Sequence, residues 1–298
     1  MNTSLKKKLK KITAFDVIVH LIGLFFLVIV AYPLIVVLSS SFSNPSLVAQ
    51  GKVVFLPKEF TLMGYEAVFS SKDIMTGYAN TIFYTVVGTL INLAVTLPAG
   101  YVLSKGRNVV GNGLFTIIFM ITMYFSGGMI PIFLLNQSLG LYNTRAVLLI
   151  MGAFSVHNCI ICRSFFVGMP KELEEAAHID GCSVFGTFTR IVLPLSKALL
   201  GVMVLYFAVG HWNSYFSAMI YLKEDAKQPL QVFLRRILVL AQQLAADPDA
   251  SEYAAELAAR EQLIRYSVIV VSSAPLLIVY PFLQKYFDKG VMIGSVKG

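Results

Sequence analysis

The sequence predicts an all-α protein that crosses a membrane six times. Of its 298 residues, 57% are hydrophobic and only 13% are charged, and the mean hydropathy is +0.73. A soluble domain is about 45–50% apolar and about a quarter charged, so this composition excludes a single soluble core. Residues 17–51, 74–104 and 108–144 contain no Asp, Glu, Lys or Arg at all. Such stretches indicate lipid as the main solvent.

The apolar segments have the lengths that membrane helices require. A hydrocarbon core of about 30 Å needs about 17 to 25 apolar residues per helix, and helices are expected because backbone groups in lipid must be bonded within the segment. Six segments qualify: 17–38, 79–103, 113–135, 146–162, 198–222 and 266–284. They form one predicted membrane domain over residues 14–290, between a basic N-terminus (1–13) and a short tail (291–298). The first apolar run exceeds the about 7–15 residues of a signal peptide, so we expect an uncleaved first span.

The charge distribution predicts the orientation in the membrane. With six spans, both termini share one side with loops 104–112 and 163–197, and that side carries 14 Lys and Arg, against 10 on the other side. The positive-inside rule then places both termini in the cytoplasm of a cell bounded by this membrane. The net charge of +8 does not indicate a nucleic-acid partner, because the basic residues lie beside apolar runs rather than on one polar face.

Three cysteines, Cys159, Cys162 and Cys182, cannot form the even disulfide framework of a small secreted domain. Cys159 and Cys162 end an apolar run without a second cysteine pair, so we interpret them as small buried apolar residues.

The loop at residues 163–197 predicts two short helices separated by a turn at the cytoplasmic face. Pro170 suits a first helical position, and Gly181 is well placed to end that helix. Ser183 can cap a second helix that runs to Arg190, and Pro194 marks the bend into the fifth span. Acidic residues near the positive end of the first helix dipole are Glu172, Glu174 and Glu175.

This loop resembles the EAA loop of ABC-importer permeases. The matching positions are Glu175-Ala176-Ala177, Gly181 after three further residues, and then Ile191-x-Leu193-Pro194. In that family the loop is a coupling helix that seats in a cleft of a cytoplasmic ATPase. The resemblance therefore implies that ATPase contacts come from Glu175, Ala176, Ala177, Asp180, Gly181, Ile191, Leu193 and Pro194. The small Ala176 and Ala177 would let another helix approach closely, and Glu175 could pair with an arginine.

The C-terminal region resembles carbohydrate-type permeases, specifically the second permease subunit of the maltose-importer kind. The residues that carry this resemblance are Tyr280-Pro281 with the following tail, and Trp212-Asn213-Ser214-Tyr215 in the fifth span. The resemblance implies that the tail reaches between two ATPase subunits, with contacts from Gly294, Ser295, Val296, Lys297 and Gly298. Candidate residues for a sugar translocation path are Trp212, Asn213 and Tyr215.

The same resemblance implies the partners and the energy source. We expect a second permease subunit, two copies of a cytoplasmic ATPase, an extracytoplasmic solute-binding protein, an oligosaccharide substrate and membrane lipid. The sequence has no G-x-x-x-x-G-K-[ST] loop, so ATP and Mg²⁺ would bind the ATPase, and the chain itself is expected to hold no cofactor or metal and to be no enzyme. The outer loop at 223–265 resembles the loop that contacts the binding protein, although it is longer than usual.

Two alternatives remain open from the sequence. One is an ABC permease for a non-sugar solute, which the C-terminal tail disfavours. The other is a membrane-embedded enzyme using Ser126-Gly127-Gly128 with His157 or His211, but residue 124 is Tyr, so the G-x-S-x spacing fails.

Overall fold

The computed structural model describes residues 13–245 and 252–295, and every regular element in those residues is a helix. The predicted all-α fold is thereby confirmed. The chain divides into two compact units, residues 1–67 with 241–270 and residues 68–240 with 271–298. Helices α14 (Leu230–Ala245) and α15 (Glu252–Ser295) contribute residues to both units.

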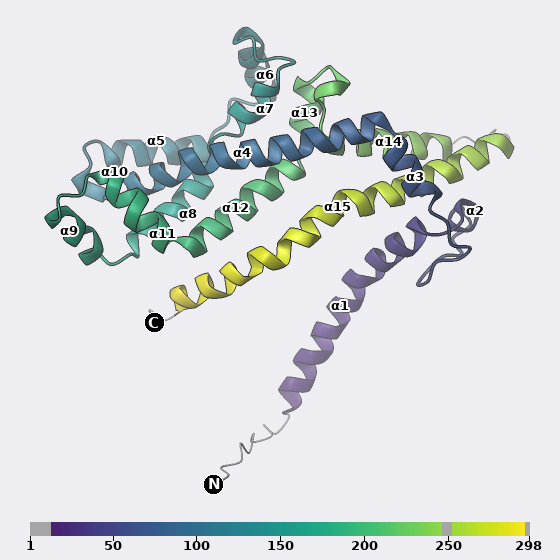
Figure 1. Ribbon diagram of the computed structural model, residues 1–298, viewed down its shortest axis with the longest axis horizontal. Helices are drawn as coiled ribbons and strands as arrows, with labels where there is room; N and C mark the ends of the chain where they lie inside the picture. Colours follow the sequence, from purple (N-terminus) through teal and green to yellow (C-terminus); the bar gives the residue numbers. More distant parts are fainter. Residues whose placement is uncertain (1–12, 246–251, 296–298) are drawn as a thin grey trace. The chain divides into compact units, whose positions relative to one another are not determined.

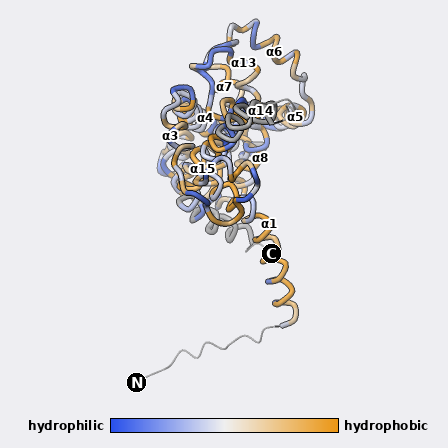
Figure 2. The backbone as a smooth tube through the Cα atoms, turned by 90° about the vertical axis from the view of Figure 1, so that its right-hand side faces the viewer, coloured by the Kyte–Doolittle hydropathy of each residue, from blue (hydrophilic) through white to orange (hydrophobic). Residues whose placement is uncertain are grey.

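The first unit begins with α1 (Ala14–Ser41), which extends the predicted span at both ends. A capping box starts this helix: the Thr13 side chain accepts a hydrogen bond from the Asp16 amide, and the Asp16 carboxylate accepts one from the Thr13 amide at 2.9 Å. Along α1 the apolar side chains are exposed, and Figure 2 shows the helix as hydrophobic over most of its length. A helix surrounded by lipid is expected to have this surface.

The C-terminal end of α1 is held by polar contacts with α3 (Met63–Ser70) and α15, and the short helix α2 (Pro45–Ala49) follows it. The Ser41 and Tyr65 hydroxyls lie 2.8 Å apart, and the Ser267 hydroxyl donates to the Ser41 carbonyl at 3.4 Å. A Cβ atom at Gly64 would lie 2.2 Å from the Ser267 hydroxyl, so only glycine fits there without displacing Ser267.

The second unit is organised around α4 (Lys72–Ser104), which packs against α8 (Val156–Val167) and α12 (Lys197–Trp212) (Figure 1). The remaining elements of this unit are η1 (Gly106–Asn108), α5 (Asn112–Tyr124), α6 (Met129–Ser138), α7 (Arg145–Met151), α9 (Glu172–Ile179), α10 (Val184–Thr187), η2 (Phe188–Val192), α11 (Leu193–Leu195), α13 (Phe216–Tyr221) and η3 (Asp225–Lys227).

Helices α4 and α8 approach each other closely. A Cβ atom at Gly100 would lie 2.6 Å from the Cβ atom of Cys162, so the contact depends on glycine in α4 and a small residue in α8. Cys159 and Cys162 are fully buried, which confirms their interpretation as small core residues. The same region holds a buried cluster from four elements: Leu97, Tyr101, Cys162, Phe166, Phe188, Val192, Leu199, Met203 and Phe207.

By length and composition, three helical segments of the described chain can cross a membrane unaided: Ala14–Ser41, Lys72–Ser104 and Glu261–Pro281. Three further candidates are pairs of helices bent at a short break: Asn112–Tyr124 with Met129–Ser138 at 114°, Arg145–Met151 with Val156–Val167 at 45°, and Val184–Leu195 with Lys197–Trp212 at 85°. Six spans result only when each bent pair is counted as one span.

Three of the predicted spans are interrupted. The predicted helix 113–135 is interrupted at residues 125–128, where Gly128 has φ +86°, a value outside the helical region. The predicted helix 146–162 is interrupted at residues 152–155, and the predicted helix 198–222 at residues 213–215. In the last case, α12 ends at Trp212 and α13 begins at Phe216.

The loop predicted on the outer side contains more helical residues than expected. Within the expected loop 223–265, the structure has η3 and α14, and α15 begins at Glu252 rather than at residue 266. Helix α15 then continues past residue 284 to Ser295, although it contains Pro275 and Pro281.

A polar network at residues 141–145 and 221–236 holds the turn before α7 against the segment after α13. Asn143 has φ +57°, and its side-chain oxygen accepts hydrogen bonds from the amides of Lys223 and Glu224. Its side-chain nitrogen donates to the Glu224 carboxylate at 2.6 Å. Hydrogen bonds from Lys227 and from Asn143 lower the pKa of Glu224 below its usual value, and the bond from Arg236 does the same for the pKa of Asp225.

Replacing Asn143 by Ala should destabilise this network by about 1–3 kcal/mol, because it removes three side-chain hydrogen bonds. Alanine also tolerates a positive φ less well than asparagine, whose polar side chain can form local hydrogen bonds in that conformation. Amide hydrogen exchange of residues 221–228 should accelerate. Asn143→Gly loses the same bonds but tolerates the backbone angle, so its loss should be smaller. Equal exchange in Asn143→Ala and the wild type would contradict this account.

Candidate functional site

The first part of the site is the loop after α8, where α9 carries three acidic residues in its first turn. The helix begins at Glu172 after Lys171, so Pro170 precedes the helix rather than occupying its first position. Glu172, Glu174 and Glu175 lie near the N-terminal end of the helix, where the macrodipole stabilises negative charge.

Helix α9 ends in a Schellman motif at Gly181. The Cys182 amide donates to the Ala177 carbonyl at 2.9 Å, and the Gly181 amide donates to the His178 carbonyl at 3.1 Å. Gly181 has φ +75°, a conformation that residues with a Cβ atom rarely adopt. No atom lies within 4 Å of a Cβ built there, so the backbone angle and not the available space requires glycine. The prediction that Gly181 ends this helix is confirmed.

The next helical segment starts at the predicted cap but continues further than predicted. The Ser183 hydroxyl accepts a hydrogen bond from the Gly186 amide at 3.1 Å. Residues 184–195 are then helical through the π-turn of η2, so the segment passes Arg190 and ends at Leu195. The bend of 85° falls at Ser196, two residues after the predicted Pro194, where the Ser196 hydroxyl bonds the Val192 carbonyl at 2.7 Å.

The loop has two different faces. Ile179 follows Glu175 by four residues and Ala176 by three, so these three lie on one exposed face of α9, and Asp180, which caps the helix, is exposed beside them. Val184 and Phe185 are exposed on α10. Ile179 is 86% exposed and Phe185 75% exposed, which is unusual for large apolar residues outside lipid. We call these six residues the coupling surface. Exposed apolar groups beside a carboxylate are typical of a protein interaction site.

The opposite face of α9 packs within the chain. Ala177 is only 4% exposed, so the expectation that both alanines admit another helix is wrong for Ala177 and stays a prediction for Ala176. Glu174 forms an ion pair with Lys105 at the C-terminal end of α4. The Lys105 ammonium also lies 4.1 Å from the centre of the Tyr101 ring, a cation–π contact.

Tyr101 links this ion pair to the buried cluster of the second unit. Its ring lies 4.9 Å from the Phe188 ring of η2 and 5.7 Å from the Phe166 ring of α8, measured between ring centres. Ile191 and Leu193 are partly buried, and Leu193 packs against this buried cluster. Pro194 is exposed.

The C-terminal end of α4 is bonded to two further helices. The Asn112 side chain donates to the Val102 and Leu103 carbonyls, and the Arg163 side chain donates to the Leu103 carbonyl at 3.3 Å. The Leu103 carbonyl lies in the last turn of α4, where a helix leaves carbonyls without a helical partner, so these side chains satisfy it. Helix α9 is therefore connected through Lys105 and Tyr101 to the end of α4, which α5 and α8 also contact.

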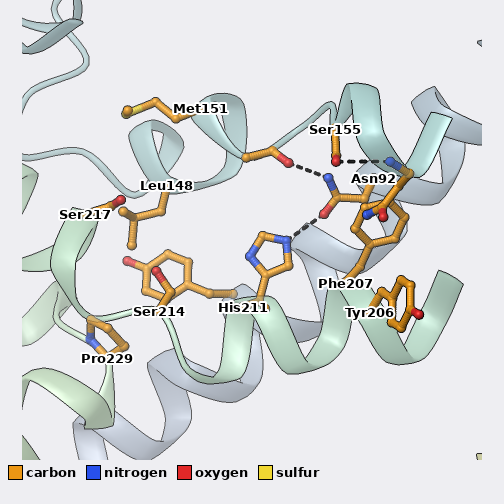
Figure 3. Close-up of a pocket in the computed structure, with 14 residues that line it drawn as sticks. Asn92, Leu148, Met151, Ser155, Tyr206, Phe207, His211, Ser214, Ser217 and Pro229 are labelled. Carbon is orange, nitrogen blue, oxygen red and sulfur yellow. Dashed lines mark hydrogen bonds between the residues drawn. The ribbon is translucent and has the colours of Figure 1, made fainter. Parts of the chain in front are cut away.

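The second part of the site is a cavity of about 360 Å³ between α4, α7–α8 and α12–α13 (Figure 3). His211 and Asn92 point toward each other, with 2.7 Å between the His211 Nε2 and Asn92 Oδ1 atoms. Asn92 also donates through Nδ2 to the Gly152 carbonyl, at the break between α7 and α8. Since the Asn92 oxygen is thus the acceptor, His211 Nε2 carries the proton.

The predicted path residues lie beside this cavity but do not line it. Trp212 is buried, donates to the Ser272 carbonyl at 3.0 Å and contacts the Tyr78 ring edge-on. Asn213 bonds the Val209 carbonyl of its own helix, and the Arg235 guanidinium lies 5.3 Å from the Tyr215 ring. The cavity is lined instead by neighbours such as Asn92, His211 and Ser214. Their position as polar residues within predicted spans is the sequence signal that points to Asn92 and His211.

The C-terminal contacts predicted from the tail fall mostly beyond what the structure describes. Val296, Lys297 and Gly298 lie outside the described residues, as do residues 1–12 of the basic N-terminus. Gly294 and Ser295 form the last turn of α15. In the described residues, no group of three or more His, Cys, Asp or Glu could hold a metal ion.

Comparison with known proteins decides the family. Residues 74–293 match the family described as "Binding-protein-dependent transport system inner membrane component". The chain belongs to this family of ABC-transporter permeases. The permease is thus a multi-pass component of the cytoplasmic membrane and of a binding-protein-dependent transporter, and it is not itself the catalytic subunit.

Several relatives match the permease over most of its length. It is 43% identical over 266 residues to Protein LplC of Bacillus subtilis, covering 89% of each chain. It is 39% identical to the Polygalacturonan/rhamnogalacturonan transport system permease protein YtcP of the same organism, covering 95% of this chain and 98% of the relative. The permease is an ABC-transporter permease of the carbohydrate-uptake type.

A solved structure matches the fold. A chain from the crystal structure of a bacterial ABC transporter involved in the import of the acidic polysaccharide alginate is 35% identical, with a TM-score of 0.82. The match covers 92% of the permease and 96% of that chain.

Exchanging the charges of Lys105 and Glu174 tests the link between α9 and α4. Lys105→Glu alone places two carboxylates in contact and removes the cation over Tyr101, so α9 should loosen by about 1–2 kcal/mol. Amide hydrogen exchange of residues 172–179 should then accelerate by roughly ten-fold. The double variant Lys105→Glu with Glu174→Lys restores the pair and should recover most of the protection. Unchanged exchange in the single variant, or no recovery in the double variant, would show that the pair does not hold α9.

Proposed function

We propose that this permease is a membrane-spanning subunit of an ATP-driven importer of oligosaccharides, in which closure of an ATPase pair is transmitted through the coupling surface. The observation that carries the proposal is the coupling surface itself. It combines Glu175 with the exposed apolar residues Ile179 and Phe185 on a segment that is anchored on its other face. An apolar face beside one carboxylate suits the cleft of a soluble partner that supplies an arginine.

The route of transmission follows from the inner face of the same segment. A push on α9 acts on α4 through the pair of Glu174 with Lys105. The push also acts on α8 and α12 through the buried cluster around Phe188. Closely packed side chains resist compression, so they transmit the push as a displacement. Three helices that carry membrane spans thus receive the movement of one short cytoplasmic helix. The resulting rearrangement is the change of access from one side of the membrane to the other.

The substrate class is proposed from the relatives. Their names give polygalacturonan and rhamnogalacturonan for one relative of Bacillus subtilis, and arabinooligosaccharides for the permease AraQ of Halalkalibacterium halodurans, at 28% identity. The solved transporter imports alginate. All are polymers or oligomers of sugars, so we propose an oligosaccharide or a polysaccharide fragment as the cargo.

The proposed assembly has four kinds of component. This permease pairs with a second permease subunit, two copies of a cytoplasmic ATPase bind ATP and Mg²⁺, and an extracytoplasmic binding protein delivers the sugar. Both termini lie in the cytoplasm, in agreement with the positive-inside rule. The polar network around Asn143 lies on the opposite side and gives the binding protein a rigid surface. The tail residues Gly294 to Gly298 contact the ATPase pair.

Replacing Gly181 by Val tests the coupling role. A β-branched residue at φ +75° is strained by at least about 1–2 kcal/mol, so the turn after α9 should shift and misplace the coupling surface. In the reconstituted complex, we expect uptake per ATP hydrolysed to fall by at least ten-fold. The transported probe is the oligosaccharide that raises the thermal midpoint of the cognate binding protein.

Gly181→Asn is the matched control, since asparagine tolerates a left-handed backbone conformation. This variant should retain coupling within about two-fold of the wild type, an estimate that follows from the small backbone cost of Asn at such a position. Normal coupling in Gly181→Val, with the complex intact, would contradict the proposal.

A further inference from the structure

The cavity between α4, α7–α8 and α12–α13 lies where helices of two predicted spans are interrupted. Backbone that leaves the helical conformation at membrane depth is tolerated where it is buried in protein or lines a polar cavity. In transporters, such interrupted helices frequently form the substrate site. The position of this cavity therefore makes it a candidate ligand site.

One end of the cavity is already fixed by internal hydrogen bonds. Asn92 donates to the Gly152 carbonyl and accepts a hydrogen bond from His211, so its amide is largely used. The His211 ring packs directly against Gly88, since a Cβ atom at Gly88 would lie 2.5 Å from two ring atoms. Asn92 and His211 thus form a wall of the cavity whose hydrogen bonds are made within the protein.

Other lining side chains have unused hydrogen-bonding capacity. Within the described residues, the side chains of Asn158, Ser214 and Ser217 have no hydrogen-bond partner, and all three are partly buried. Figure 3 shows Ser214 and Ser217 on the side of the cavity away from Asn92. An amide and two hydroxyls offer both donors and acceptors, which is what a sugar hydroxyl requires of a binding site.

The lining has no formal charge. None of the residues that border the cavity in the described part of the chain is Asp, Glu, Lys or Arg. A carboxylate placed in such a site would be buried without a cation, and burial of an unpaired charge is strongly unfavourable. The aromatic rings of Tyr206 and Phe207 add an apolar surface on one helix.

We propose that this cavity is a binding subsite for a single uncharged glycosyl unit of the transported saccharide. Its volume of about 360 Å³ lies near the lower end of ligand pockets, which measure about 300–1,000 Å³, so it suits one sugar ring better than a longer chain. The proposal rests on the proposed function as a saccharide importer. It adds that this subunit selects against a carboxylate, so uronate groups of an acidic saccharide are excluded from this position.

The test uses the complete complex of both permeases and the ATPase pair in lipid nanodiscs, without the binding protein. Saturation-transfer NMR is recorded with two probes, neutral galactotriose and trigalacturonate. The wild-type complex should give saturation transfer to galactotriose at least five-fold stronger than to trigalacturonate. Transfer to trigalacturonate equal to or stronger than that to galactotriose would overturn the proposal.

Two variants locate the signal. Ser217→Leu fills the cavity without removing a hydrogen bond of the protein, and should reduce the galactotriose signal at least five-fold. Ser138→Leu is the control, because Ser138 is exposed on α6 and outside the cavity. Equal signals in Ser217→Leu and Ser138→Leu would also overturn the proposal. ATP hydrolysis stimulated by the loaded binding protein, measured on the same samples, reports separately on the importer function.

Discussion

The structure depends on one constraint: backbone groups that leave helical hydrogen bonding within a membrane must find partners inside the protein. Each interruption of a predicted span creates such groups. At the break between α7 and α8, the Gly152 carbonyl is bonded by Asn92 of α4. At the C-terminal end of α4, side chains from α5 and α8 bond the last carbonyls. Several polar side chains within the spans therefore have a structural role. Others in the described part of the chain have no partner in the protein, and some of these line the cavity.

Helix α4 connects the two parts of the site. Its C-terminal end carries Tyr101 and Lys105, which contact the coupling segment, and its middle carries Gly88 and Asn92, which shape the cavity wall. One helix of 33 residues therefore contacts both parts of the site and connects them physically. Such a connection needs no disordered or flexible segment, because packed helices move as units.

Local rules predicted the local features of the site. Gly181 and Ser183 follow from helix-ending and helix-capping preferences, which depend on a few neighbouring residues. Contacts between distant residues could not be predicted from one sequence: Lys105 and Glu174 are 69 positions apart, and Asn92 and His211 are 119 apart. The positions of the breaks in the spans were not predicted either, because hydropathy measures transfer into lipid and is unaffected by a turn that neighbouring helices satisfy. Trp212 is buried against Tyr78, and this is again a contact between distant residues that one sequence does not reveal.

The central claim is that the exposed face of α9 is held by an ATPase that this chain does not contain. Site-specific photo-crosslinking in the native membrane tests it most directly, with the crosslinking residue at Ile179 on the exposed face and at Ala177 on the buried face. We expect crosslinks from position 179 to a nucleotide-hydrolysing subunit, with a yield that changes when ATP is added, and crosslinks from position 177 only within the permease. Absence of any ATPase crosslink from position 179, in a complex that still transports, would contradict it.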